Sequence, residues 1–225
     1  MSYQIADAVS YCEIDGQLVF LDLEADRYFR LSTALEDAFR RFVQTGDTES
    51  DARADLAKHR ILIDAPDGEP PVPSPTVATP ERSALERLPS SKGSALIALP
   101  EVAATVAWIQ RQLRMQRVPL ALLVRNAAVY RERKALCATG AIDEARLLRA
   151  VDQFNRARLL VPIEPRCLLD SMSLVRFLAR RGLYAQLIFG VSIDPFAAHC
   201  WLQRRDLVLN DSVGNVAAHT PIRTV

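Results

Sequence analysis

The pattern of apolar and polar positions divides the chain at a proline-rich stretch, residues 65–80, that has no hydrophobic periodicity. Before this stretch, two apolar runs flank the dipeptide Asp15-Gly16, a combination that predicts a β-hairpin. Helical spacing then begins after Ser32, a favoured N-cap residue, and stops at Gly46. The segment is therefore expected to contain a hairpin, a third strand and two helices, at 9–23, 27–31, 33–46 and about 49–59.

After the proline-rich stretch the spacing is helical over several segments, and from Tyr184 it becomes that of strands. The helices are expected at 95–116, 119–136, 142–159 and 167–182, and the strands at 184–193, 195–203 and 206–211. We therefore expect an α+β protein with a small module at 1–64, a linker at 65–92 and a larger domain at 93–225. In the larger domain, helices should pack on an antiparallel sheet.

Composition narrows the class of protein further. With 49% hydrophobic residues among 225, the chain can bury one large core or two small ones. It has no apolar run of about 18 residues and no basic, apolar start, so we expect neither membrane insertion nor a signal peptide, and a cytoplasmic location. Residues 1–64 carry 7 basic and 13 acidic side chains, whereas 65–225 carry 21 and 14. The acidic first module argues against binding to nucleic-acid phosphates.

The cysteines at 12, 137, 167 and 200 lack the CxxC spacing of a structural zinc site, and no Walker, GxGxxG or HExxH motif occurs. We therefore expect no metal and no cofactor. Cys167 alone falls in the first turn of an expected helix, where free amides and the helix dipole favour a thiolate. A lone cysteine in that position is more often a small buried residue, so a chemical role requires partners.

His199 and Asp211 are the candidate partners, on the last two expected strands. If these strands are joined by a three-residue turn, His199 lies opposite Asp211 on one face of the hairpin, whereas a two-residue turn would place them on opposite faces. In the first register, with the Cys167 helix packed on the sheet, the three side chains form a Cys-His-Asp arrangement. The thiolate attacks a carbonyl, the imidazole carries the proton and the carboxylate holds the imidazole tautomer.

Three stretches of this region carry a family resemblance: RCLLDSMSLVRFLARRGLYAQLIFGV, PFAAHCWLQ and VLND. They are similar to the transglutaminase-like cysteine protease of lasso peptide biosynthesis, the leader peptidase known as the B protein. The resemblance runs from about residue 142 to the C-terminus and implies a transglutaminase- or papain-like domain with Cys167, His199 and Asp211 as catalytic residues. It departs from the family pattern at Cys200, where alanine is usual, and at Gln203, where an acid is common.

The first 64 residues resemble a winged helix-turn-helix, and also the small recognition element of this pathway, which is similar to the pyrroloquinoline-quinone chaperone. Such elements bind the leader peptide as an added strand beside their third strand, next to a helix. The resemblance implies leader contacts from the third strand and the second helix, at Tyr28, Phe29, Arg30, Arg53 and Leu56. Ordinary core packing is the alternative interpretation for Tyr28, Phe29 and Leu56.

The same resemblance implies the partners. The substrate is a lasso precursor peptide, cut between leader and core, and a separate asparagine synthetase-like cyclase uses ATP to close the freed core amine on an acidic side chain. Two other functions stay open on the residues alone. One is acyl transfer to amines by the same three groups, as in transglutaminases or arylamine acetyltransferases. The other is a non-catalytic role as a peptide-binding or DNA-binding regulator.

Overall fold

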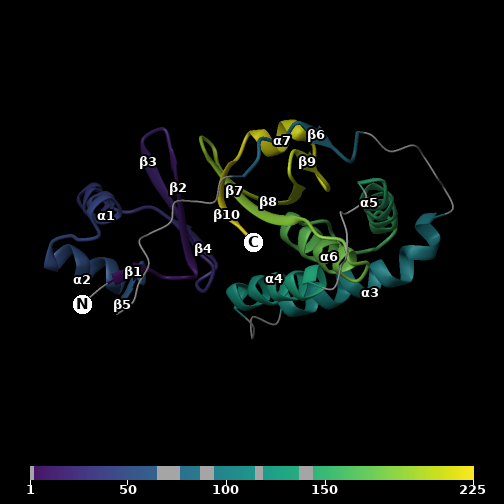
Figure 1. Cartoon of the computed structure of the whole chain (residues 1–225), viewed down its shortest axis with the longest axis horizontal. Coiled ribbons are helices and arrows are strands. Elements are labelled where there is room, and N and C mark those ends of the chain that lie inside the picture. The colour runs from purple at the N-terminus through teal and green to yellow at the C-terminus, as the bar shows by residue number, and fades with distance from the viewer. Residues whose placement is uncertain (1–2, 65–76, 87–93, 115–118, 137–143) are drawn as a thin grey trace. The chain divides into compact units, whose positions relative to one another are not determined.

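A computed structural model of the chain describes residues 3–64, 77–86, 94–114, 119–136 and 144–225 (Figure 1). The chain forms two compact units, Met1–Thr76 and Val77–Val225. Both units combine helices and strands, so the predicted mixed α+β class is confirmed. Within the described ranges, no helix is long and apolar enough to cross a membrane.

The first unit consists of two small sheets and two helices. One sheet has the order β2-β3-β4 and the other pairs β1 with β5. The elements are β1 (Tyr3–Ile5), β2 (Val9–Ile14), β3 (Gln17–Asp22), β4 (Arg27–Phe29), α1 (Thr33–Thr45), α2 (Ser50–Lys58) and β5 (Leu62–Asp64). The expected hairpin is present, and Asp15 and Gly16 take φ values of 50° and 76°, the positive angles that its two-residue turn requires. Gly46 ends α1 in a left-handed conformation, as expected.

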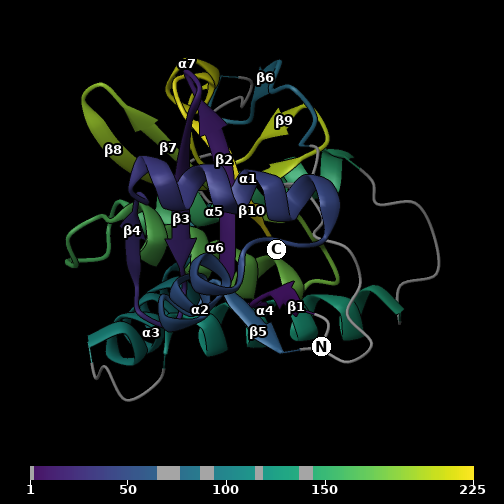
Figure 2. The same ribbon diagram turned by 90° about the vertical axis from the view of Figure 1, so that its left-hand side faces the viewer.

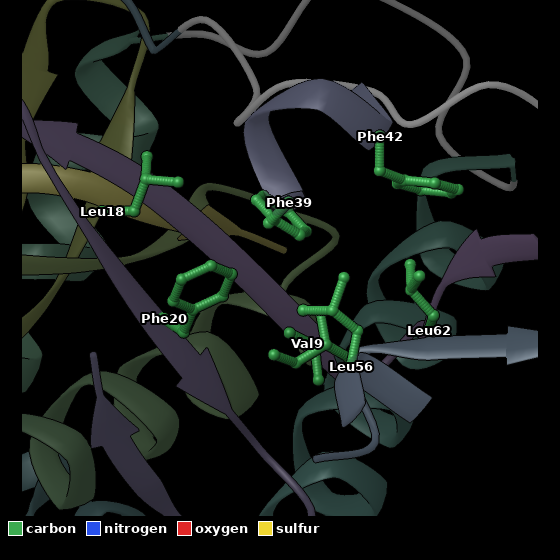
Figure 3. Close-up of a cluster of buried hydrophobic side chains, with 8 residues drawn as sticks. Val9, Leu18, Phe20, Phe39, Phe42, Leu56 and Leu62 are labelled. Carbon is green, nitrogen blue, oxygen red and sulfur yellow. The ribbon is translucent and has the colours of Figure 1, made fainter. Parts of the chain in front are cut away.

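The core of this unit lies between α1 and the three-stranded sheet (Figure 2). Phe39 and Phe42 of α1 belong to one buried cluster with side chains of the strands and α2 (Figure 3). Phe20 of β3 meets Phe39 edge to face, with ring centroids 5.0 Å apart. Leu56 of α2 belongs to the same cluster and is 0% exposed. Pairing of the short β1 with β5 was not predicted, because three-residue strands leave almost no periodic signal.

The second unit packs helices against a five-stranded sheet of order β10-β7-β8-β9-β6 (Figure 1). Its helices are α3 (Ser94–Arg114), α4 (Leu120–Leu136), α5 (Glu144–Arg158), α6 (Cys167–Ala179) and α7 (Val213–Ala217). Its strands are β6 (Arg82–Ser83), β7 (Gln186–Ile193), β8 (Phe196–Arg204), β9 (Leu207–Val208) and β10 (Thr220–Thr224). Helix α3 packs on α5 and α6, and α6 packs on β8. Helix α6 therefore joins the helical layer to the sheet.

The expected linker at 65–92 is corrected in its described part. Residues 77–86 belong to the second unit, where β6 pairs in parallel with β9. Arg82 fixes this strand, because its guanidinium donates to Asp206 of the β8–β9 turn at 2.5 Å (Nε to Oδ2) and to Glu144 of α5 at 2.7 Å. A two-residue strand is too short to give a periodic hydrophobic pattern. The prolines around β6 are typical of an extended linker, which is why a linker was predicted here. The rest of that range lies outside the described residues.

Of the two turns considered between β8 and β9, the structure has the two-residue turn, which does not give the register that would place His199 opposite Asp211. Gln203 pairs with Val208 and Arg204 with Leu207, so the turn contains two residues. Arg205 takes the positive φ of 54° that a tight hairpin turn requires at its first central position, and its carbonyl accepts a hydrogen bond from Gln203 Nε2 at 2.6 Å. Strand β9 also ends at Val208, so Asp211 lies beyond the hairpin. The alternation of side chains between the two faces of a strand therefore cannot predict where Asp211 points.

Candidate active site

Cys167 is the first residue of α6 and is an exposed residue. Arg166 at the N-cap makes no side-chain capping hydrogen bond. A hydrogen bond with His199 lowers the pKa of the Cys167 thiol, and hydrogen bonds from the backbone amides of Leu168 and Cys200 act in the same direction against partial desolvation. The sulfur is therefore poised as a thiolate at the positive end of a helix.

His199 lies in the middle of β8 and joins the other two predicted residues. Its Nε2 is 2.5 Å from Oδ2 of Asp211, which leaves Nδ1 to face the thiol of Cys167. The Asp211 carboxylate, and next the thiol, raise the pKa of His199 to about 9. The structure thus brings Cys167, His199 and Asp211 together. The lowered pKa of Cys167 and the raised pKa of His199 both favour a thiolate beside an imidazolium over the neutral pair.

The carboxylate of Asp211 is held from three sides. Its Oδ1 accepts the Ser212 amide at 2.7 Å, and its Oδ2 accepts Asn215 Nδ2 at 2.9 Å in addition to His199. Burial favours the neutral acid, but these hydrogen bonds outweigh it and lower the pKa of Asp211. Its backbone carbonyl accepts Ser83 Oγ at 2.6 Å. These contacts, rather than strand register, bring Asp211 to His199.

Two neighbouring rings, those of Trp201 and His219, contact the imidazole of His199. The Trp201 indole stacks on the His199 ring with centroids 5.8 Å apart and 18° between the planes. Its Nε1 donates to Gln203 Oε1 at 3.0 Å, and Gln203 Nε2 donates in turn to the carbonyl of Ala78. The ring centroid of His219 lies 5.1 Å from that of His199. The His199 imidazole therefore contacts the rings of both Trp201 and His219.

A cleft of about 590 Å³ lies beside the first turn of α6. Its lining includes Pro165 and Asp170, which flank Cys167 in sequence, and Asn210, which precedes Asp211. The charged groups in the lining are paired with one another: Arg158 binds Asp170 at 2.6 Å, and Arg156 binds Asp152. Most of the remaining wall is apolar, with side chains such as Leu85, Leu159, Val161 and Ile163. The cleft therefore suits an uncharged, apolar group.

The predicted leader-contact residues divide into two groups. Tyr28 and Phe29 are half-buried on the edge strand β4, and Arg30 follows them and is exposed. Arg53 of α2 lies over the Tyr3 ring at 5.4 Å and pairs with an aspartate. Leu56 is fully buried in the core, which matches the alternative interpretation given above and removes it from the set of surface contacts.

The part of the chain that the structure describes contains no candidate metal centre. Among the described residues, no three His, Cys, Asp or Glu side chains lie close enough to hold a metal ion. Cys12 and Cys200 are buried, and burial raises the pKa of each thiol, as expected of core cysteines. Cys137 lies outside the described residues.

Sequence reasoning missed several residues that complete the site. Asn215 carried a usable signal, because Ser212 is a favoured N-cap residue and a helix beginning there returns residue 215 towards Asp211. The Ser212 hydroxyl indeed accepts the Asn215 amide at 3.2 Å. Ser83 gave no such signal in the sequence, because it precedes Asp211 by more than a hundred residues along the chain.

Comparison with known proteins gives one match. A protein-family model described as the transglutaminase-like superfamily matches residues 101–224, more than half of the chain. A search of curated proteins and a search of solved structures returned no match. The matched range contains α6, β8 and the segment after β9, which carry Cys167, His199 and Asp211.

Proposed function

The chain belongs to the transglutaminase-like superfamily, and from that premise we propose that it is a cysteine peptidase that cleaves the leader from a lasso precursor peptide. The observation that carries the peptidase proposal is the contact of one imidazole with both a thiol and a carboxylate. His199 bonds to Asp211 on one side and to Cys167 on the other. This is the arrangement of nucleophile, base and orienting group that acyl chemistry requires.

The proposed reaction follows from the protonation states of the pair. The Cys167 thiolate attacks the carbonyl carbon of the scissile amide, and protonated His199 gives its proton to the departing amine. This leaves a thioester between Cys167 and the acyl fragment and a neutral imidazole. Neutral His199 then takes a proton from water, whose oxygen attacks the thioester, and the thiolate is released. Asp211 keeps the imidazole in the orientation that both steps need.

The first unit is proposed to hold the substrate. Its β4 is an edge strand of the three-stranded sheet, and an edge strand offers backbone groups for an added peptide strand. We assign leader contacts to Tyr28, Phe29 and Arg30 on and after this strand and to Arg53 on α2, in a winged-helix-like module. Covalent connection to the peptidase unit raises the effective concentration of the scissile bond. The resemblance to lasso peptidases supplies the precursor as substrate and an ATP-using cyclase as the partner that consumes the core.

Mass spectrometry of a precursor peptide incubated with the wild-type protein and with Cys167→Ala tests the proposal. We expect intact leader and core from the wild type alone. The reaction is run in water enriched in heavy oxygen and with an added primary amine. Incorporation of the heavy oxygen into the leader carboxyl establishes hydrolysis, whereas joining of the leader to the amine would establish acyl transfer instead. Equal products with Cys167→Ala would overturn both.

A further inference from the structure

We infer that Ser171 and Asn210 are positioning residues that lock the helix of the nucleophile to the strand of the base. The inference rests on the proposed function, because it assigns these residues a role in the reaction of Cys167 and His199. Neither residue contacts the thiol or the imidazole through any described hydrogen bond of its side chain. Their effect must therefore pass through the backbone that carries those groups.

The two side chains form a continuous hydrogen-bond chain across three segments. Ser171 Oγ donates to the carbonyl oxygen of Cys200 at 3.0 Å and accepts Asn210 Nδ2 at 2.9 Å. Asn210 Oδ1 accepts the backbone amide of Leu202 at 2.8 Å. Ser171 is 0% exposed, so no water competes for its hydroxyl. These hydrogen bonds together link α6, β8 and the segment after β9.

Each anchor of this chain lies next to a reacting group. Ser171 follows Cys167 by one helical turn on the same side of α6. Cys200 follows His199 directly on β8, and its backbone amide also bonds to the thiol. Asn210 directly precedes Asp211. A shift of the helix along the strand would thus change the thiol–imidazole separation and the amide contact to sulfur together, and misplacement by about 1 Å costs about a hundredfold in rate.

Ser173 provides an internal control on the same helix. It is also 0% exposed, and its hydroxyl also donates to a backbone carbonyl, at 2.7 Å. That carbonyl belongs to Leu169 of α6 itself, so the bond does not cross to the sheet. Replacing either serine by alanine deletes one buried hydroxyl, but only Ser171→Ala cuts the link between helix and strand.

The test compares Ser171→Ala and Ser173→Ala in the full chain. We expect Ser171→Ala to lower kcat for precursor cleavage about 10- to 100-fold with KM changed less than about threefold, and Ser173→Ala to stay within about twofold of wild type. The pH dependence of Cys167 alkylation by iodoacetamide is measured in parallel. It should show a higher thiol pKa in Ser171→Ala only, a change that loss of stability alone does not produce.

A second variant tests whether the hydrogen bonds of Ser171 and Asn210 act as one linkage. Asn210→Ala should reproduce the kinetic effect, and the double variant Ser171→Ala/Asn210→Ala should be less than about threefold worse than the poorer single variant, since both break one linkage. Equal losses in the two serine variants with an unchanged alkylation profile would overturn the positioning role. Alkylation needs no substrate, so its profile tests the positioning role even if the wild type cleaves nothing, an outcome that would refute the proposed function instead.

Discussion

Gly190 of β7 lies against the indole ring of Trp201 on β8. A Cβ atom at residue 190 would come within 2.6 Å of Trp201 Cζ3 and 3.1 Å of His219 Cβ, and Gly190 is also the register partner of His199. The indole is buried and bonded to Gln203, so it has little room to withdraw. The space that glycine leaves open is therefore filled by the indole ring that stacks on the imidazole of His199.

Gly190→Ala should consequently displace Trp201 and disturb His199. We expect a loss of about 1–3 kcal/mol in the free energy of unfolding, as for other overpacked sites, together with a fall in kcat of about tenfold. Urea unfolding and steady-state cleavage measure the two effects. Gly214→Ala is the matched control, because a Cβ there meets nothing within 4 Å. Activity and stability of Gly190→Ala equal to those of Gly214→Ala would contradict the packing account.

The pH profile of cleavage should report the thiolate–imidazolium pair. The rate rises as Cys167, whose pKa is lowered, loses its proton, and falls as His199 loses its own at a pKa of about 9. Asp211→Asn removes the charge that most raises the His199 pKa, so the alkaline limb of kcat/KM should move to lower pH. We also expect kcat to fall about a hundredfold or more, since the tautomer is no longer fixed. Asp194→Asn, in the exposed β7–β8 turn, should leave the profile unchanged.

Residues 77–86 should be required by the peptidase unit, although the sequence suggested a linker. Ser83 Oγ holds the Asp211 carbonyl, and the Ala78 carbonyl accepts Gln203 Nε2. A chain beginning at residue 77 should therefore cleave slowly with a raised KM for the precursor, because only the first unit is lost. A chain beginning at residue 93 should lose cleavage and melt at a lower temperature. Equal cleavage by the two truncated chains would show that β6 is dispensable.

The cleft beside α6 should bind an apolar side chain of the substrate. Two neighbouring leucines separate this role from a general surface effect: Leu159 lines the cleft and is 84% exposed, whereas Leu160 does not line it and is 53% exposed. Leu159→Glu should raise KM about tenfold, the equivalent of losing about 1.4 kcal/mol of apolar contact. Leu160→Glu should change KM less than about twofold. Similar KM values for both variants would exclude the cleft as the binding surface.

Local signals in the sequence predicted much of this structure. The Asp15-Gly16 turn, the end of α1 at Gly46 and the start of α6 at Cys167 each depend on neighbouring residues, and each is found where the pattern indicated. The meeting of His199 with Asp211 was expected only if a three-residue turn joined their strands, and the structure has a two-residue turn. It occurs because Ser212, Asn215 and Ser83 hold Asp211 beyond the end of β9.

The remaining features depend on contacts between distant residues. The pairing of β6 with β9 and the linkage from Ser171 to Asn210 join segments whose own sequences carry no mark of their partners. A tight turn at Arg205 was equally hidden, because arginine is not among the residues that usually take positive φ. Such features follow only from the folded arrangement as a whole.

The most direct test of the account is to capture the thioester on Cys167. The wild-type protein is mixed with precursor peptide under single-turnover conditions, quenched with acid after milliseconds to seconds, and mapped by mass spectrometry of its proteolytic fragments. The account predicts that the fragment containing Cys167 gains the mass of the leader acyl group and loses it as free leader accumulates. Leader release that proceeds without this adduct, or at the same rate in Cys167→Ala, would contradict it.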